Sequence, residues 1–596
     1  MSKRIILLLF FSILNSGIVP WTAMAQGLDE EVVVTASAYP VPFGNLSRTV
    51  KVVSREEIER LPVRTIVDVL RLASSVDLRG RTPFGIQTDL SIRGANFSQV
   101  LVLVDGLRIN DSQTAHHNAD FPVSLDAVER IELLFGPGSS LYGADAFGGA
   151  INIITRKLEA GTRARLAVGE NGLIDTAFTG SAVAGKLTET VSVSGMRSSG
   201  FAFDRDFRTV GISSRTAFGT KSSVLFSHLN KEFGAAGFYG DAPSREWTNQ
   251  TWLSLDQTLS SGGRHQATLQ AFYRTHGDHF LWDMRRPGFF ENRHRTHAVG
   301  AVTRLGWKVS DNSFLTVGAD AGADWINSGN LGDHAFGRLS GFSELQISLG
   351  KSAALYPGLR IDDYSNFDSA VNPSLSASWW VSPRVRLRSA AGRAFRIPSF
   401  TELYYRDPNH EAYAGLAPET SWAAEMATDV MVSPSSMASV TVFSRWDRNL
   451  IDWTRQRPED KWTTSNIRGV DTRGVELGWE YKFASGATLE TEYTYLASQP
   501  GSIPLLSKYV MDYARHSWTT SGSIPLPLAF RYAQRTDYRR RHDGRKYWIM
   551  DGRLTREFRG WTWHVGCDNF LDSRYQEVLG VNMPGRWCQT GIEVRR

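Results

Sequence analysis

Hydrophobic and polar residues alternate in repeated segments of about ten residues from about residue 157 to the C-terminus. The clearest segment runs from Val475 to Phe483, and after the turn ASGA a second runs from Leu489 to Tyr495. Further alternating segments are Leu375 to Trp379, Ala438 to Phe443 and Trp561 to Cys567. Successive side chains of a β-strand point to opposite faces, so each segment predicts a strand with one apolar and one polar face. We therefore expect a mainly β region over residues 157–596.

Residues 44–156 follow a different pattern. Apolar residues recur at helical spacing from Ser54 to Leu61 and from Thr65 to Leu72. Ser54 followed by Glu57 is a capping-box pattern, which satisfies unpaired amides in the first helical turn. The stretch VLVLVDGLRIN places an Asp-Gly pair between two short apolar runs, which predicts a β-hairpin because both turn positions tolerate positive φ. These residues are expected to form a compact α+β domain.

The first 25 residues have the pattern of an export signal. Lys3 and Arg4 precede an apolar stretch from Ile5 to Val19, and cleavage is expected after the small-residue motif that ends at Ala25. The apolar stretch has about 15 residues, fewer than the ~20 that a membrane-spanning helix needs, and no later segment reaches that length without charges. A helical membrane protein is therefore not expected.

Export, the lack of a spanning helix and aromatic-rich alternation over about 440 residues favour an outer-membrane barrel over a soluble β-sandwich. Lipid offers no hydrogen bonds to the backbone, so a spanning sheet must be closed. At roughly 20 residues per strand and connection, the region supplies about 22 strands, a size for which a plugged lumen is expected. We predict a mainly β fold: a transmembrane antiparallel β-barrel of about 22 strands, with the N-terminal α+β domain as a plug inside the lumen.

Composition and motifs exclude other function classes. The net charge of +5 is small for 596 residues, so nucleic acid is not an expected partner. No nucleophile elbow and no HExxH zinc motif stands out, so the chain is not expected to be an enzyme. The two cysteines, Cys567 and Cys588, flank the final hairpin and share faces with apolar residues. If these strands pair in register, both cysteines point outward near the extracellular end, and we expect a cross-strand disulfide.

Long motifs in both regions resemble the TonB-dependent receptors of Gram-negative outer membranes. In the first region they are LSIRGANFSQVLVLVDGLRIN (90–110) and VERIELLFGPGSSLYGADAFGGAINIITR (128–156). In the second they are GRAFRIPSFTELYY (392–405), GLAPETSWAAEM (415–426), RGVELGWEYKF (473–483) and DNFLDSRYQEVLGVNMPGR (568–586). The resemblance covers nearly the whole mature chain and is closest to the vitamin B12 (cobalamin) receptor group. It implies four parts: a signal peptide (1–25), a TonB box and linker (26–43), a plug domain (44–156) and a transmembrane β-barrel (157–596).

The segment EEVVVTA resembles the family's TonB box, which would add a strand to the periplasmic protein TonB through main-chain hydrogen bonds. The residues concerned are Glu30, Glu31, Val32, Val33, Val34, Thr35 and Ala36. Taken alone, the same segment is also compatible with an edge strand of the plug or a disordered tail.

The resemblance implies TonB-dependent active transport of a scarce, bulky nutrient across the cell outer membrane, driven by the proton gradient of the inner membrane. Cobalamin is the expected ligand, a ferric siderophore is the main alternative, and haem is a third. The implied partners are TonB, outer-membrane lipid, the small-molecule ligand and, during biogenesis, the barrel-assembly machinery.

Histidines provide the candidate ligand contacts. His116, His117 and Asn118 lie in NDSQTAHHNADFP, which the resemblance places on the apical, ligand-facing side of the plug, although solvated loop histidines are the alternative. His410 lies between FRIP and GLAPE, an interval in which haem receptors of the family can carry an iron ligand. A candidate calcium loop offers only Asp204 and Asp206, whereas calcium needs six to eight oxygen ligands. Calcium is left open without support, and no other cofactor or metal site is expected.

Five plug residues are expected to have structural roles, namely Arg93, Gly94, Asp105, Gly106 and Glu129. Arg93 and Glu129 are charges that an enclosing barrel would bury, so each is expected to pair with an opposite charge from the barrel wall. The family usually has Arg where this chain has Phe135, which changes one plug contact.

Overall fold

The computed structural model describes residues 32–33, 35, 37–38, 41–157, 160–240, 242–262, 264–500 and 506–596. The expected signal peptide lies outside the described residues, as do Glu30, Glu31, Val34 and Ala36 of the expected TonB box. In the part of the chain so described, no helix has the length and apolar character needed to cross a membrane.

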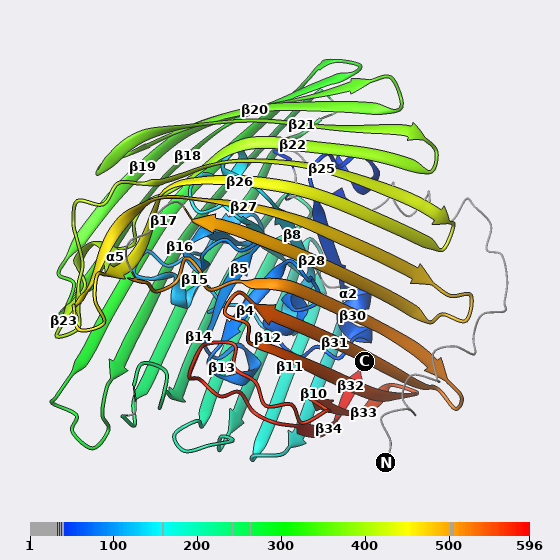
Figure 1. The fold of residues 1–596 in the computed structure, drawn as a ribbon. Coiled ribbons are helices and arrows are strands. Elements are labelled where there is room, and N and C mark those ends of the chain that lie inside the picture. Colours follow the sequence, from blue (N-terminus) through cyan, green and yellow to red (C-terminus); the bar gives the residue numbers. More distant parts are fainter. Residues whose placement is uncertain are drawn as a thin grey trace.

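Within these residues, 22 antiparallel strands of eight residues or more close into a barrel (Figure 1). The first strand pairs with the last, with Ala164 opposite Val594, so the sheet has no open edge. The strands are β10 (Gly161–Gly169), β11 (Leu173–Ala184), β12 (Leu187–Ser198), β13 (Phe207–Phe218), β14 (Ser222–Gly234), β15 (Arg245–Ser261), β16 (His265–Leu281), β17 (Glu291–Ser310), β18 (Ser313–Ser328), β19 (His334–Leu349), β20 (Ala353–Tyr364), β21 (Phe367–Ser382), β22 (Val385–Arg396), β25 (Glu419–Ser433), β26 (Ser436–Arg455), β27 (Trp462–Lys482), β28 (Thr488–Pro500), β30 (Ala514–Leu526), β31 (Phe530–Arg541), β32 (Lys546–Phe558), β33 (Trp561–Asp568) and β34 (Trp587–Arg595). The predicted barrel is therefore confirmed.

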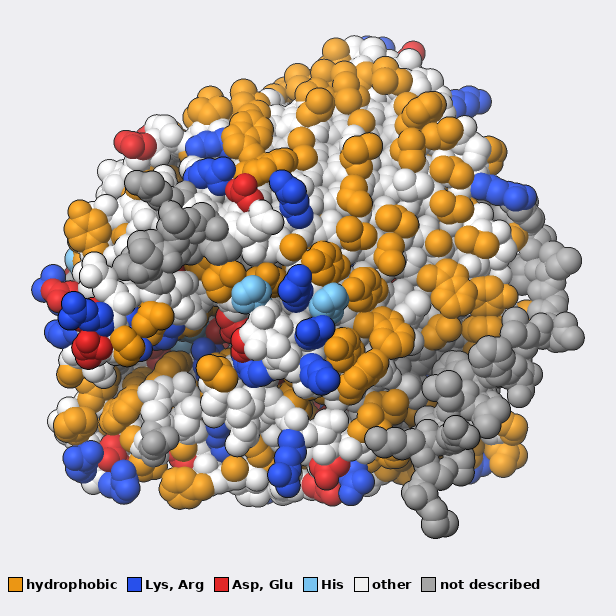
Figure 2. Space-filling model, in the orientation of Figure 1, with side chains coloured by type: hydrophobic (Ala, Val, Ile, Leu, Met, Phe, Trp, Pro, Cys, Tyr) orange, Lys and Arg blue, Asp and Glu red, His pale blue; other side chains and the backbone are white. Residues whose placement is uncertain are grey.

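Side chains along the barrel strands alternate between the outer and inner faces. In β27, Leu477 and Trp479 are 45% and 39% exposed, whereas the intervening polar residues point inward; Glu476, for example, accepts a hydrogen bond from Ser75 of the plug at 2.5 Å. Figure 2 shows hydrophobic side chains spread over the outer wall of the barrel. This apolar outer surface is the one that a bilayer covers.

The N-terminal residues form an α+β plug, drawn in blue inside the barrel in Figure 1. The order of its main sheet is β3-β8-β9-β6-β7, and two smaller sheets pair β4 with β5 and β1 with β2. The plug strands are β1 (Val32–Val33), β2 (Val41–Pro42), β3 (Val50–Ser54), β4 (Val76–Gly80), β5 (Thr88–Ile92), β6 (Val100–Val104), β7 (Leu107–Arg108), β8 (Val128–Phe135) and β9 (Gly149–Thr155). Its helices are α2 (Arg55–Arg60), α3 (Ile66–Leu70) and α4 (Ser139–Tyr142), with 3₁₀ turns η1 (Phe43–Asn45), η2 (Pro83–Gly85), η3 (Phe97–Gln99), η4 (Ala115–His117) and η5 (Leu125–Ala127).

The expected capping box opens helix α2. Ser54 Oγ accepts from the Glu57 amide at 3.4 Å, and the Glu57 carboxylate accepts from the Ser54 amide at 2.9 Å. The helix ends at Arg60 because Leu61 precedes Pro62 and takes an extended backbone, with ψ of 162°. Local capping and proline chemistry therefore set both ends of this helix.

The hairpin predicted at the Asp-Gly pair joins β6 to β7. Asp105 and Gly106 have φ of 49° and 81°, the left-handed conformations that a tight hairpin turn requires. Asp105 also accepts hydrogen bonds from Thr155 on β9 at 2.9 and 2.6 Å. The turn is therefore fixed to the last strand of the plug.

The plug packs directly against the inner wall of the barrel. Wall residues Leu225, Trp252, Phe272 and Phe342 belong to the same buried cluster as the apolar residues of the plug sheet. Trp252 is fully buried and stacks on Phe272 with ring centroids 5.2 Å apart. The plug and the wall thus share one hydrophobic core.

The two rims of the barrel differ. We call the rim that carries the start of β10 and the C-terminus the near rim. The opposite rim, called the far rim, carries α5 (Phe400–Tyr404) and the short strands β23 (Arg406–Asp407), β24 (His410–Glu411) and β29 (Leu506–Ser507). The last far-rim connection, residues 569–586, folds back to the plug. Its Glu577 is fully buried and accepts from Arg71 at 2.6 Å and from the Gly80 amide at 2.7 Å.

Cys567 and Cys588 are joined by a disulfide and lie directly opposite each other in β33 and β34. Both are at the far-rim ends of their strands, where the connection that contains Glu577 begins and ends.

Proteolysis of receptor from native membranes without reductant is expected to give one peptide pair linked through Cys567 and Cys588, because the two thiols face each other across adjacent strands. Mass spectrometry checks this. Alkylation of both cysteines before reduction would contradict the pairing.

The expected pairing of Glu129 with the barrel wall is wrong. Its side chain is 46% exposed and its partner is Arg156 of the plug, at 3.5 Å. Glu129 is the second residue of β8, where solvent reaches the plug sheet, so no wall charge is needed there.

Candidate functional site

Arg93 ties the plug to the barrel wall, as expected for a charge that the barrel buries. Its side chain is 3% exposed and donates to Glu425 at 2.5 Å and to the two oxygens of Glu476 at 2.7 and 2.6 Å. The guanidinium carbon lies 4.3 Å from the ring centre of Phe443 and 5.3 Å from that of Phe135. Phe135 therefore packs on Arg93 in this chain. Gly94, with φ of 71°, continues the turn that presents Arg93 to the wall.

Part of the expected TonB box is held by the plug. Val33 pairs with Val41 in the two-stranded sheet of β1 and β2. Thr35 is buried, and its amide and hydroxyl donate to Glu132 of β8 at 2.9 and 2.6 Å. Asn152 of β9 donates to the Thr35 hydroxyl at 2.9 Å.

This arrangement leaves one edge of the box segment free in the described structure. β1 has β2 on one side and no other strand partner among the described residues. A strand added to β1 therefore has an available edge, and Thr35 connects the segment to β8 and β9.

His410 lies at the far rim among aromatic rings. Its Nδ1 is 3.0 Å from Asp407, its Nε2 is 3.4 Å from Lys508 Nζ, and its ring meets that of Trp453 edge-on with centroids 5.1 Å apart. Both ring nitrogens are thus already engaged, and Asp407 holds one of them in place.

A basic-aromatic cluster surrounds this histidine at the far rim. We define it as Trp453, Arg455, Trp462, Lys508 and Tyr509. Arg455 lies 4.2 Å from the ring centre of Trp462, and Lys508 lies 5.9 and 5.2 Å from those of Trp462 and Tyr509. The cluster combines positive charge with flat apolar surfaces.

His116 joins the plug to this cluster. Its Nδ1 is 2.6 Å from Asp89, its ring stacks on Phe97 at 4.5 Å, and the ring centroid of Tyr509 lies 6.1 Å away. Burial lowers the pKa of His116 despite the Asp89 carboxylate beside it. The structure therefore brings His116 to Tyr509 and His410 to Lys508, two neighbouring members of this cluster.

His117 and Asn118, expected among the ligand contacts, are both buried, so neither side chain is open to solvent. Asn118 Oδ1 accepts from the Asp111 amide at 3.0 Å, and His117 Nε2 lies 3.4 Å from Asp278 of β16.

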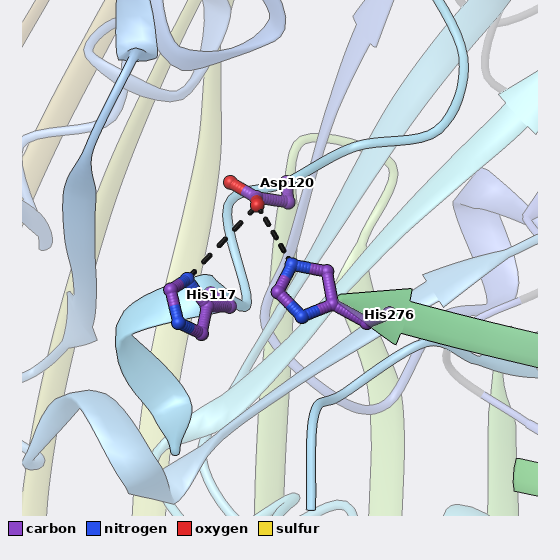
Figure 3. A group of neighbouring side chains, drawn as sticks. All are labelled: His117, Asp120 and His276. Atoms are coloured by element: carbon purple, nitrogen blue, oxygen red, sulfur yellow. Dashed lines mark hydrogen bonds and ion pairs between the residues drawn. The ribbon is translucent and has the colours of Figure 1, made fainter. Parts of the chain in front are cut away.

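His117 belongs to a buried group with Asp120 and His276, shown in Figure 3. Asp120 Oδ2 lies between the two imidazoles, 3.0 Å from His276 Nε2 and 4.0 Å from His117 Nδ1. Burial lowers the pKa of an imidazole, but contact with Asp278 and Asp120 outweighs burial and raises the pKa of His117 to about 10. Carboxylates therefore surround the ring of His117.

Sequence reasoning missed His276, Asp278 and Asp120. The first two occupy alternate positions in THGDHF, so they point to the same face of one strand, and this inward polar face was the available signal. Asp120 follows His117 by three residues but is placed by the tertiary fold. Of the candidate calcium acids, Asp206 pairs with Arg245 at 2.9 Å. Neither Asp204 nor Asp206 belongs to a group of three metal-ligating side chains in the described part of the chain.

Comparisons with known proteins agree with this architecture. The family described as TonB dependent receptor-like, beta-barrel matches residues 165–570, and the TonB-dependent Receptor Plug Domain matches residues 44–150. The Vitamin B12 transporter BtuB of Vibrio vulnificus (strain CMCP6) is 25% identical over 491 residues, 76% of each chain. The iron-regulated outer membrane virulence protein of Vibrio cholerae serotype O1 (strain ATCC 39315 / El Tor Inaba N16961) is 26% identical over 572 residues, 84% of each chain.

Solved structures share the fold. The siderophore receptor PirA from Pseudomonas aeruginosa is 19% identical, with a TM-score of 0.72 over 92% of this chain and 99% of its own. A mutant of the ferric enterobactin receptor PfeA from the same organism is 17% identical, with a TM-score of 0.75 over 92% and 98%. A barrel with no open edge, a plug that fills it and a family match over both halves lead to one conclusion: the chain belongs to the TonB-dependent receptors and is an outer-membrane β-barrel.

Proposed function

We propose that this receptor imports a scarce, bulky nutrient by TonB-driven active transport, with cobalamin as the first candidate ligand. The near rim, which carries the box segment, would face the periplasm, and the far rim would face the outside. The observation that carries the transport proposal is the bond of Thr35 to Glu132 and Asn152, because a pull on the box then loads β8 and β9 of the plug sheet. A plug that shares its core with the wall must rearrange before a bulky molecule can pass.

Cobalamin is supported by the relatives named as vitamin B12 transporters, which match three quarters of this chain. A ferric siderophore is the second candidate, and one observation favours it. The basic-aromatic cluster offers Arg455 and Lys508 beside the rings of Trp462 and Tyr509, a surface suited to an anionic iron chelate with aromatic groups. A relative named as iron-regulated matches 84% of the chain. Haem is third, because both nitrogens of His410 are engaged by Asp407 and Lys508.

Equilibrium binding of cyanocobalamin, ferric enterobactin and haem to detergent-purified receptor separates these ligands. We expect cyanocobalamin to bind, and Lys508→Ala to leave its affinity unchanged because cyanocobalamin carries no net charge for Lys508 to neutralise. Binding of ferric enterobactin alone, weakened by at least about tenfold in Lys508→Ala, would instead establish the second candidate. Binding of haem alone, lost in His410→Ala, would reject both.

A further inference from the structure

Six acidic and imidazole side chains meet in a dry layer between the plug and the wall. The plug contributes Asp111, His117 and Asp120, and strands β15 and β16 contribute Glu246, His276 and Asp278. All six are buried. Buried charges in such numbers must be balanced locally, because their desolvation is otherwise too costly for the fold.

Permanent cations balance only half of this charge. Lys231 lies 2.5 Å from Asp120 Oδ1, and Arg274 lies 2.7 Å from Asp111 Oδ2. The nearby Arg81 is paired with a further acid, Asp89, at 3.1 Å. The remaining carboxylates, Asp278 and Glu246, adjoin His117, so a cation held by the imidazoles would be stabilised there.

The geometry around Asp120 fits a metal ion. Metal–ligand bonds of ~2.1 Å at tetrahedral angles place ligand atoms about 3.4 Å apart. Asp120 Oδ2 is 3.0 Å from His276 Nε2 and 4.0 Å from His117 Nδ1, so the observed separations bracket that value (Figure 3). The three ligand atoms also lie within 4.8 Å of one another. Lys231 occupies the other oxygen of Asp120 and leaves Oδ2 for the ion.

Each imidazole also has the outer partner that metal-bound histidines normally have. The nitrogen of His276 that faces away from Asp120 lies 3.1 Å from Asp111, and the corresponding nitrogen of His117 lies 3.4 Å from Asp278. A carboxylate at this position fixes the ring and makes the opposite nitrogen a better ligand. Arg274 and Gln113 in turn hold Asp111 and Asp278, at 2.7 and 2.9 Å.

An unpaired carboxylate oxygen beside the group is an independent sign that something is bound here. Among the described residues, Asp278 Oδ1 is buried and makes no hydrogen bond. Buried side-chain atoms of this kind nearly always have a partner. A bound ion would orient both rings and align His276 Nδ1 with Asp111. Its positive charge would also offset the negative charge of the surrounding carboxylates.

We propose that His117, Asp120 and His276 form a site for a divalent transition-metal ion such as Zn²⁺, which links the plug to strand β16 of the barrel. Two imidazole nitrogens and one carboxylate oxygen are the donor set that Zn²⁺ favours, whereas calcium and magnesium prefer oxygen alone. Asp278 and Glu246 form a second close group with His117. The ion would hold the segment that contains η4 against the wall at the far-rim side of the plug.

Zinc titration of tag-free, EDTA-treated receptor tests the site at pH 7.4. We expect one Zn²⁺ per chain by calorimetry and elemental analysis, and binding at least about 100-fold weaker in His276→Gln and His117→Gln. Asp111→Asn should weaken binding by ~10 to 100-fold through the ring of His276 alone. His265→Gln is the matched control, because His265 is an exposed histidine on the same strand and should leave the affinity unchanged.

Copper provides a readout on the unmodified chain, so the test does not depend on how the variants fold. Cu²⁺ bound in place of zinc is expected to show hyperfine coupling to two imidazole nitrogens in electron paramagnetic resonance. Absence of stoichiometric Zn²⁺ from the wild-type receptor would overturn the proposal. Coupling to fewer than two nitrogens would overturn it as well. So would an unchanged zinc affinity in a His276→Gln barrel that is shown to be folded by its heat-dependent shift in electrophoresis.

Discussion

Val33→Pro is expected to abolish TonB-driven uptake while leaving ligand binding at equilibrium intact. Proline removes the amide that Val33 would donate to an added strand and fixes φ, so we expect uptake to fall by at least about tenfold for each ~1.4 kcal/mol of lost TonB affinity. The proposed ligand surface at the far rim is at the other end of the molecule and should be unaffected. Radiolabelled ligand uptake by whole cells, with binding to isolated membranes, measures both quantities.

Val41→Pro is the matched control, because Val41 is the residue opposite Val33 in the internal two-stranded sheet. It disturbs the same sheet but leaves the amides of the box in place, so uptake should persist. Uptake lost equally in both variants would mean that the sheet of β1 and β2 matters rather than pairing with TonB. Normal uptake in Val33→Pro would remove the box from the mechanism.

Arg93→Met is expected to loosen the plug severely. The substitution leaves Glu425 and Glu476 buried without their cation, which costs ~3 to 5 kcal/mol for a buried ion pair broken on one side. Hydrogen-exchange mass spectrometry in urea should show earlier loss of protection in β5 and β6, on either side of Arg93 and η3, while the barrel strands keep theirs. Replacing both glutamates by Gln in the same chain should recover much of the loss.

Arg60→Met supplies the comparison for a surface pair. Arg60 contacts Glu56 at 3.1 Å, but the Glu56 side chain is 84% exposed, so this pair is worth less than about 1 kcal/mol. Equal loss of protection in Arg60→Met and Arg93→Met would show that burial of the Arg93 pairs contributes nothing specific to plug stability.

Local signals in the sequence predicted the parts of the fold that local chemistry determines. The alternation at Leu477 and Trp479 reports which face of a strand meets lipid, and the Asp105-Gly106 pair reports a turn, because both depend on residues a few positions apart. The pairing of Cys567 with Cys588 could be predicted because their strands follow each other in the chain and pair with each other, although 21 residues separate the two cysteines.

Errors arose where burial depends on residues far away in the chain. Glu129 and Arg93 are both charged residues of the plug, but only Arg93 pairs with the wall. His117 lies against Asp278 of β16, a strand that begins at His265. The sequence around His117 indicates a polar loop and does not predict its contact with Asp278, which lies far away in the chain. The buried group of Figure 3 combines residues from both domains, so no single stretch of the sequence could have predicted it.

Glu577 has a consequence for the order of assembly. It is fully buried, and both of its oxygens are used by plug residues that are synthesised long before it, Arg71 and Gly80. A cylinder that closed around an unfolded N-terminal domain would enclose water, and this carboxylate would lack its native partners. Closure of the barrel between its first and last strands therefore becomes most favourable only once the inner domain has reached its native position. Completion of the C-terminal part of the chain thus depends on correct folding of the N-terminal part.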